Sequence, residues 1–494
     1  MTFIERLVRA ASPEKPACIA GDQELTYGDL SRFAEDHARE MRELKGRGNV
    51  ALLLPNSLDY VQWYMTVLHA GHVVVPIGWN TTAYEVANTI NRFDIGMVIT
   101  RQEIIQAMEN REFEHDFAYI CTDTGLRGHI GGTGREIPDT GAPEDVVLML
   151  GTSGSTQSPK KVMLTERNLL INGQDIIESL RYRPDERFLV VLPLTYAAAN
   201  ESQWIVSLLL GATVALYTGP LYPANLYRTI RDQRITSLTA VPSLLRVLLQ
   251  SGAHQTISAP SLRTLCFGGG PSDTRTLEQA SRVYRELNIV HMYGLTEATT
   301  RVSHLTGQDF HQQIGSVGKP IGGIEVKIAD ESGAGVPPKT SGEILVKGGN
   351  VMKGYYRQEE QTKQAIRDGW LWTGDIGWQD QSGYLYITGR KSNKIIYSGM
   401  NIYPEEIEEV IFRSGLVKDV FVYGVSNAWK EEVLTADILP LAPAEPPSAL
   451  TGALKRYMEG NLPPYKIPAV FRLVDTIEKT SNGKTRRTAR ACQG

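Results

Sequence analysis

Cysteine is scarce in this chain and is never clustered. Its four cysteines, Cys18, Cys121, Cys266 and Cys492, lie far apart in 494 residues. They form no Cys-x-x-Cys pair, and no histidine stands near them at the spacing of a zinc site. The sequence therefore excludes a disulfide framework and a structural zinc site, and we expect reduced thiols.

The chain also lacks an excess of charge and long apolar runs. Its 51 basic residues nearly balance 55 acidic ones, so it has no positive footprint for nucleic acid. No apolar run reaches the length that spans a bilayer, and Glu5 and Arg6 stand where a secretory signal has its apolar core. We expect a cytoplasmic protein without a membrane span that acts on a small molecule.

The chain does contain a repeated alternation of β-branched apolar runs and helical patterns. With 42% hydrophobic residues over this length, it can bury large cores in two or more domains. The alternation predicts βαβ units around largely parallel sheets, which is an α/β fold. Expected strands are 50–54, 73–77, 97–100, 188–192, 213–217, 237–240, 264–267 and 289–292, and expected helices are 58–69, 83–93, 204–210, 225–233 and 242–250.

The pattern changes beyond about residue 315. Short alternating segments at 324–328 and 343–347, with glycine-rich turns, predict a small antiparallel β subdomain that extends to 386. After Arg390, expected strands and helices alternate again in a compact α+β segment of ordinary domain size. We predict an N-terminal domain at 1–390 and a C-terminal domain at 391–494, the latter with helices 404–413 and 448–460 and strands 417–425 and 434–439.

One loop, at 150–160, combines small, hydroxylated and cationic residues. Its glycine permits backbone conformations that are closed to other residues, while hydroxyls and an amine can donate to phosphate oxygens. The Walker-type spacing is absent, and an ordinary loop between apolar runs has a similar composition. If the loop binds a triphosphate, the residues involved are Thr152, Ser153, Gly154, Ser155, Thr156 and Lys160.

Further motifs follow this loop in a fixed order. They are Leu192-Pro193-Leu194-Thr195-Tyr196, Gly268-Gly269-Gly270-Pro271, Tyr293-Gly294-Leu295-Thr296-Glu297, Trp372-Thr373-Gly374-Asp375, Gly389-Arg390-Lys391-Ser392 and Asn482-Gly483-Lys484. The succession resembles the adenylate-forming superfamily of acyl-CoA synthetases, luciferases and peptide-synthetase adenylation domains. The resemblance covers essentially the whole chain and is closest in motif pattern to acyl- or aryl-CoA ligases.

The resemblance implies a site for ATP and Mg²⁺. Tyr293 would stack on adenine, Thr296 would contact phosphate and Glu297 would help to hold Mg²⁺. Asp375 can accept hydrogen bonds from both ribose hydroxyls, and Arg390 matches a second ribose contact. Each motif alone also fits an ordinary turn or a solvated side chain. The remaining nucleotide or acyl contacts implied are Gly268, Gly269, Gly270, Pro271, Met292 and Gly294.

Lys484 matches the lysine that bridges the acid and the α-phosphate during adenylation. It stands after Asn-Gly, a tight-turn signal, where an exposed lysine is otherwise unremarkable. In such enzymes the C-terminal domain rotates about a hinge, which falls here on Ser392, between the two half-reactions. The segment from Ser398 to Pro404 matches the one that lines the site during thiolation.

The chain departs from the family pattern at several positions. Gln157 and Lys161 replace common glycines, which predicts a stiffer loop with an added positive charge near the phosphates. Tyr196 stands where relatives have histidine or another aromatic residue, and we expect it to gate the carboxylate end of the pocket. His291 replaces an amide residue that contacts adenine, and we expect a structural role for it.

The substrate predicted is a small carboxylic acid with an apolar acyl or aryl body. Adenylation domains for α-amino acids place an aspartate just after the Pro-Leu motif, but this chain has Tyr196, Ala197, Ala198, Ala199 and Asn200 before Glu201. A buried ammonium without a partner is costly, although Glu201 leaves an amine-bearing acid open. Tyr196, Ala197, Ala198, Asn200, Gly268 and Gly294 are the expected substrate contacts.

The acceptor thiol is the second unknown. Coenzyme A is the first choice, and the phosphopantetheine of a separate carrier protein is the alternative, because no carrier domain follows Lys484 within the sequence. A non-catalytic nucleotide-binding homologue is a further alternative. The intact Glu297, Asp375, Arg390 and Lys484 argue against it.

Overall fold

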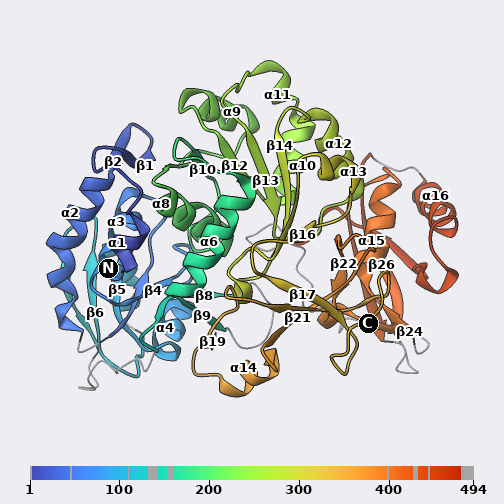
Figure 1. Ribbon diagram of the computed structural model, residues 1–494. Coiled ribbons are helices and arrows are strands. Elements are labelled where there is room, and N and C mark those ends of the chain that lie inside the picture. The colour runs from blue at the N-terminus through green and yellow to red at the C-terminus, as the bar shows by residue number, and fades with distance from the viewer. Residues whose placement is uncertain are drawn as a thin grey trace.

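The computed structural model describes residues 3–44, 47–109, 111–131, 143–152, 160–397, 400–426, 432–442 and 446–479. Two large sheets and their helices form the N-terminal part of the molecule. A small antiparallel sheet follows, and a three-stranded sheet with two helices forms the C-terminal part (Figure 1). The predicted α/β fold, with a large N-terminal and a smaller C-terminal domain, is confirmed.

The first large sheet has eight strands in the order β19-β9-β8-β4-β3-β5-β6-β7. Its central strands β3, β4 and β5 are buried throughout because successive side chains enter two different cores. Val50 and Leu52 face one core, whereas Ala51 faces the other. The strands are β3 (Asn49–Leu52), β4 (Val73–Pro76), β5 (Ile95–Thr100), β6 (Phe117–Cys121), β7 (Arg127–Ile130), β8 (Val146–Gly151), β9 (Lys161–Thr165) and β19 (Gly354–Tyr355).

The second large sheet has nine strands in the order β16-β15-β14-β13-β12-β10-β11-β1-β2. The run from β14 to β1 is parallel, so the carboxyl ends of β13 and β14 meet at one edge of the sheet. The strands are β1 (Pro16–Ala20), β2 (Gln23–Thr26), β10 (Arg187–Val190), β11 (Thr213–Leu216), β12 (Ser237–Ala240), β13 (Thr264–Gly268), β14 (Asn288–Tyr293), β15 (Ser303–Thr306) and β16 (Lys319–Pro320).

Helices between and around the two sheets join them into one apolar core. The side chains of α3 (Leu58–His69), α6 (Glu166–Leu180) and α8 (Val206–Leu210) are part of it. The side chain of Ser57 accepts a hydrogen bond from Tyr60 N, which fixes the predicted start of α3. Other helices of this part are α1 (Phe3–Leu7), α2 (Tyr27–His37), α4 (Ala83–Arg92), α5 (Gln102–Met108), α9 (Pro223–Asp232), α10 (Pro242–Ser251), α11 (Ala253–Thr256), α12 (Thr274–Val283) and α13 (Gln308–Gln312).

Within the described ranges, no helix is both long enough and apolar enough to cross a bilayer. Three cysteines, Cys18, Cys121 and Cys266, are buried free thiols. Cys492 lies outside the described residues.

The small antiparallel sheet pairs β17, β18, β21 and β20 in that order, with β22 on β21. Its longest strand, β21, pairs with β22 so that Asp375 lies directly opposite Arg390. The strands are β17 (Glu325–Ala329), β18 (Gly342–Lys347), β20 (Ile366–Arg367), β21 (Trp370–Gln379) and β22 (Leu385–Arg390), and α14 (Glu359–Ala365) lies beside them.

The C-terminal part has an apolar core of its own, which includes Ile407, Val422 and Leu454. Helix α15 docks on the N-terminal part, where Glu409 accepts hydrogen bonds from the backbone N and the hydroxyl of Thr274 at the start of α12. The elements are β23 (Ile395–Tyr397), β24 (Met400–Ile402), α15 (Pro404–Arg413), β25 (Val417–Ser426), β26 (Glu432–Pro440), α16 (Pro447–Glu459) and β27 (Val470–Leu473).

His291 on β14 is a core residue. Its Nδ1 lies 2.8 Å from the carbonyl oxygen of Ser316, and its ring stacks on Phe267 with centroids 4.9 Å apart. The side chain is thus held by the fold, as a structural role requires. Burial lowers the pKa of His291 to about 4.

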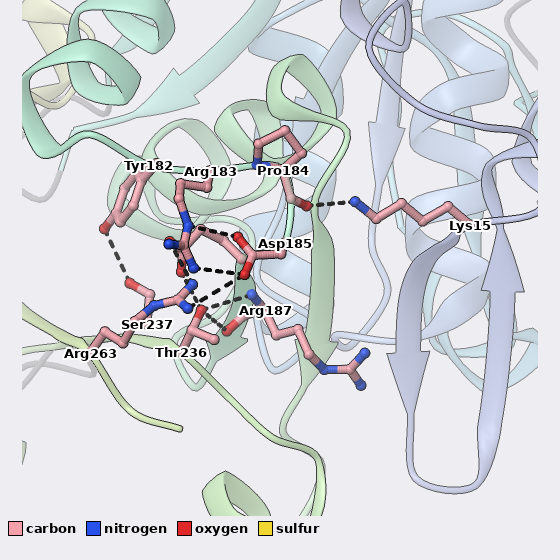
Figure 2. Close-up of polar contacts among 10 residues, drawn as sticks. Lys15, Tyr182, Arg183, Pro184, Asp185, Arg187, Thr236, Ser237 and Arg263 are labelled. Atoms are coloured by element: carbon pink, nitrogen blue, oxygen red, sulfur yellow. Dashed lines mark hydrogen bonds and ion pairs between the residues drawn. The ribbon is translucent and has the colours of Figure 1, made fainter. Parts of the chain in front are cut away.

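A polar network closes the amino-terminal edge of the nine-stranded sheet, opposite the edge where β13 and β14 end. Thr236 accepts a hydrogen bond from Arg187 N, and its hydroxyl donates to the buried carboxylate of Glu186. Arg263 pairs with Glu186 at 2.9 Å. Figure 2 shows Thr236 beside Arg187 and Arg263 in this network.

We expect Thr236→Val to destabilise the protein by roughly 1–3 kcal/mol, because it leaves a buried carboxylate oxygen and a backbone N–H without their hydroxyl partner. Thermal melting followed by circular dichroism measures the effect. Arg285→Ala is the control, since the Arg285–Glu286 pair is exposed on both sides and should contribute less than about 1 kcal/mol. Equal melting temperatures for the two variants would contradict the role of Thr236.

The pKa of His291 predicts how stability depends on pH. Its folded value of about 4 lies below the value of about 6.5 for an unfolded imidazole, so the unfolded chain binds the proton first as pH falls. Because of His291, the free energy of unfolding should therefore decrease by roughly 1 kcal/mol for each pH unit as the pH falls from about 6.5 to 4. The melting temperature, measured at several pH values in this range, should fall less steeply with decreasing pH for His291→Gln than for the wild type. The same pH dependence in both proteins would refute the lowered pKa of His291.

Candidate active site

The end of β14 meets the small antiparallel sheet at Asp375. The hydroxyl of Tyr293 donates to Asp375 Oδ2 at 2.8 Å, and Nε of Arg390 donates to Asp375 Oδ1 at 2.7 Å. Asp375 is 5% exposed, whereas half of the Arg390 side chain is exposed, and the carboxylate raises the pKa of Arg390. The structure thus brings Tyr293 to the β21–β22 pair, although Asp375 lies 82 residues further along the chain.

Two glycines allow the backbone segments at this edge to approach one another. A Cβ at Gly294 would collide with the carbonyl oxygen of Thr300, and one at Gly268 would collide with that of Met292. Gly268 and Met292 are register partners at the ends of β13 and β14. Gly269, Gly270 and Pro271 continue from β13 at the same edge, next to Tyr293 and Gly294.

The phosphate loop is described only at its base. Thr152 N donates to the carbonyl oxygen of Lys160 at 3.3 Å, which closes the turn between β8 and β9. Ser153, Gly154, Ser155, Thr156 and Gln157 lie outside the described residues. The Nζ of Lys160 lies 4.7 Å from the ring centroid of Tyr355.

Tyr355 connects this lysine to Glu297. Its hydroxyl donates to Glu297 Oε1 at 2.9 Å. Glu297 belongs to a short 3-10 turn, η3 (Thr296–Ala298), directly after the Tyr293–Gly294 pair. Thr296, Glu297 and Lys160 are therefore grouped at one place, with Tyr355 between the lysine and the carboxylate.

Sequence reasoning missed Tyr355. The available signal was the run Lys353-Gly354-Tyr355-Tyr356-Arg357, in which aromatic residues are flanked by cations. The position of Tyr355 in the site depends on the antiparallel pairing of β19 with β9, which no local sequence pattern predicts. Glu343 was also missed: it accepts a hydrogen bond from Gly374 N and pairs with Lys391 at 2.7 Å.

Lys161, at the start of β9, is a buried lysine. Its side chain is buried, and its Nζ donates to the carbonyl oxygen of Pro76 at 3.2 Å and lies 5.8 Å from the Phe93 ring centroid. Burial lowers its pKa to about 8. The added positive charge that the sequence predicts here is therefore buried in the domain, where the carbonyl oxygen of Pro76 binds the amine.

The predicted acyl-binding segment is helical but irregular. After Tyr196, a short turn α7 (Ala197–Ala199) passes into a π-helix η2 (Asn200–Ile205) and then into α8. Tyr196, Ala197 and Ala198 are half-buried. Asn200 is fully buried, donates to Leu194 O and accepts from the Tyr64 hydroxyl, so it holds the segment in place.

The hinge residue predicted, Ser392, is exposed in a 3-10 turn, η4 (Lys391–Asn393). Its neighbours tie this turn to both parts of the chain, because Lys391 pairs with Glu343 and Asn393 donates to Glu405. Ser398, Gly399 and Lys484 lie outside the described residues.

Comparison with known proteins identifies the family. The family model for AMP-binding enzymes matches residues 6–356, and the model for their C-terminal domain matches 406–484. The chain is 32% identical over 480 residues to feruloyl-CoA synthase from Amycolatopsis, covering 96% of this chain and 94% of that protein. It is 30% identical to 2-succinylbenzoate–CoA ligase from Bacillus licheniformis, covering 96% of both.

A solved structure of similar architecture is o-succinylbenzoate-CoA synthetase from Bacillus subtilis in complex with its acyl-adenylate intermediate. It has a TM-score of 0.85 and 26% identity, and the match covers 98% of this chain and 96% of that one. The same enzyme in complex with ATP and magnesium matches with a TM-score of 0.83 and 26% identity, covering 98% of both chains. The family and the ligase class predicted from the motifs are confirmed: the chain belongs to the AMP-binding enzymes, the adenylate-forming family.

Proposed function

We propose that the protein joins a carboxylic acid to ATP as an acyl-adenylate, releasing pyrophosphate, and then transfers the acyl group to the thiol of coenzyme A. The observation that carries the proposal is the meeting of Tyr293, Asp375 and Arg390 at the carboxyl edge of a parallel sheet, where open α/β sheets bind ligands. The named relatives, which are CoA ligases, support the same reaction.

In this proposal Asp375 binds the ribose of ATP. Each carboxylate oxygen can accept two hydrogen bonds, so Asp375 can bind ribose hydroxyls while it keeps Arg390. The Tyr293 ring, held by its hydroxyl, offers a face for adenine, and the backbone at Gly269, where a Cβ would meet no atom within 4 Å, can approach the base closely.

The group around Tyr355 suits the phosphates and Mg²⁺. Magnesium is bound by oxygen ligands and usually takes one or two protein carboxylates together with phosphates and water, which fits Glu297 with Thr296 beside it. When bound, the ion neutralises charge on the phosphates. Lys160 supplies a second positive charge, and the ring of Tyr355 holds its amine near Glu297.

The chemical step needs charge stabilisation at the α-phosphorus. A carboxylate oxygen of the acid attacks this phosphorus, a new P–O bond forms, and the bond to pyrophosphate breaks. We assign to Lys484 the task of bridging the acid and the α-phosphate as negative charge develops. We further propose that residues 391–494 move as a unit about Ser392 to admit the thiol.

Replacing Lys484 tests the catalytic assignment. Exchange of labelled pyrophosphate into ATP, measured with a panel of aromatic and aliphatic acids, should depend on the acid added. Lys484→Ala should lower the exchange rate by about a hundredfold or more, the range seen when one charge-stabilising group is removed. Lys455→Ala, an exposed lysine on α16, is the control and should exchange like the wild type.

Two results would count against the proposal. If no acid in the panel supports exchange, the acid-activating function is wrong. If exchange occurs but Lys484→Ala leaves it unchanged, the function stands and the role of Lys484 is wrong. Adding coenzyme A, and separately a phosphopantetheine-bearing carrier protein, then identifies the acceptor; thioester formation only with the carrier would overturn the choice of coenzyme A.

A further inference from the structure

The π-helix η2 is the most unusual part of the acyl-binding segment. All six of its residues are buried, yet four consecutive ones carry a buried polar atom that finds no hydrogen-bond partner among the described residues. These atoms are Glu201 Oε1, Ser202 Oγ, Gln203 Oε1 and Trp204 Nε1. Buried polar groups are nearly always paired, and π-helical turns are often found at functional sites. The segment therefore contains unused hydrogen-bonding capacity.

Among these four residues, Glu201 is the best candidate for binding a ligand. Its side chain is 3% exposed, and only its Oε2 is engaged, accepting from the Thr300 hydroxyl at 2.6 Å. Thr300 follows the Thr296–Glu297 turn, and Glu201 follows Tyr196 by five residues. The Glu201 carboxyl thus links the segment after Tyr196 to the segment after the Thr296–Glu297 turn. If Tyr196 gates the carboxylate end of the acid pocket, the acid lies between these two segments.

Thr300 is held firmly in this position. It is a β-branched residue with a φ of +61°, which is sterically unfavourable. Its N donates to the carbonyl oxygen of Leu295, and its own carbonyl oxygen packs against Gly294, where a Cβ would collide. The hydroxyl of Thr300 therefore fixes one oxygen of Glu201 and leaves the other to be used elsewhere.

The residues one turn before Glu201 are small. Helical side chains lean toward the preceding turn, so the carboxyl of Glu201 leans toward Ala197 and Ala198. Both alanines are half-buried, and each carries only a methyl group beside the path that an acyl chain would take past Tyr196. Five residues separate Glu201 from Tyr196, which at no more than about 1.5 Å per residue places them up to about 7.5 Å apart along the segment. This separation lets Tyr196 meet the carboxylate end of an aromatic acid while Glu201 meets a substituent on the remote part of its ring.

The protonation state of Glu201 limits which functional groups of a substrate it can bind. Burial raises its pKa to about 8, so near neutral pH the carboxyl holds a proton, and Oε1 is the oxygen free to carry it. A substrate ammonium would require this buried group to ionise, whereas a hydroxyl can accept from the acid form or donate to the carboxylate. Tyr64 packs edge-on against Trp204 of η2, with ring centroids 6.4 Å apart, so the segment has aromatic rings beside it.

We propose that Glu201 is the specificity-determining residue of this enzyme, and that its Oε1 selects an aromatic acid bearing a hydroxyl on the part of the ring remote from the carboxylate. This assignment rests on the proposed acid-activating function and adds the substrate class to it.

Matched pairs of acids that differ by one hydroxyl test the proposal. The pairs are 4-hydroxybenzoate with benzoate and 4-hydroxycinnamate with cinnamate, used with the full-length enzyme. In pyrophosphate exchange, kcat/KM for the hydroxylated member should exceed that of its partner by about tenfold or more in at least one pair, because a pocket built for a hydrogen bond rejects the analogue that lacks it. Glu201→Leu should reduce this ratio to about one, and Glu201→Gln, which keeps a donor and an acceptor, should retain most of it.

A binding measurement separates this inference from the reaction itself. Calorimetry with the same pairs should show the same preference in the wild type and its loss in Glu201→Leu, while the affinity for ATP stays unchanged. Exchange with no acid despite this binding preference would refute the proposed function and leave the role of Glu201 intact. Equal binding of both members by the wild type, a preference for 4-aminomethyl analogues, which carry an ammonium at neutral pH, or an unchanged ratio in a folded Glu201→Leu variant would overturn the inference.

Discussion

The carboxylate of Asp375 accepts hydrogen bonds from side chains that belong to two different sheets. Tyr293 is the last residue of the parallel strand β14 in the nine-stranded sheet, and Arg390 is the last residue of β22 in the small antiparallel sheet. Because Asp375 and Arg390 are cross-strand partners, the ion pair also fixes the register at which the chain leaves the N-terminal part. The nucleotide contacts proposed and the path into the C-terminal part thus depend on the same buried carboxylate.

Much of the fold could be predicted from the sequence because local patterns specified it. The helices expected at 58–69 and 404–413 have those bounds in the structure, since a serine cap and a first-turn proline mark their starts. The expected helix 204–210, in contrast, begins earlier and passes through a π-helix. Hydrophobic periodicity assumes 3.6 residues per turn, so it cannot reveal a turn that holds an extra residue.

The motif residues of the site could be predicted from the sequence, but the contacts between their side chains could not. The resemblance of the motifs to the adenylate-forming family indicated Tyr293, Glu297, Asp375 and Arg390. It did not indicate the hydroxyl of Tyr355 that binds Glu297, which requires β19 to pair with β9. Lys161 shows the same limit: the sequence predicts an added positive charge beside the phosphate loop, but not the burial of its amine against Pro76 and Phe93. Side-chain direction is set by tertiary packing, which a motif does not encode.

The π-helix also affects how this chain should be aligned with its relatives. An α-helix turns by about 100° per residue, so deleting one residue from η2 would restore regular winding and rotate everything before it by about that angle relative to α8. Glu201 would then no longer face Thr300, and a neighbouring side chain would take its place. A one-residue gap at this point in an alignment therefore marks a change in the chemistry of the pocket wall, even where every flanking residue is the same.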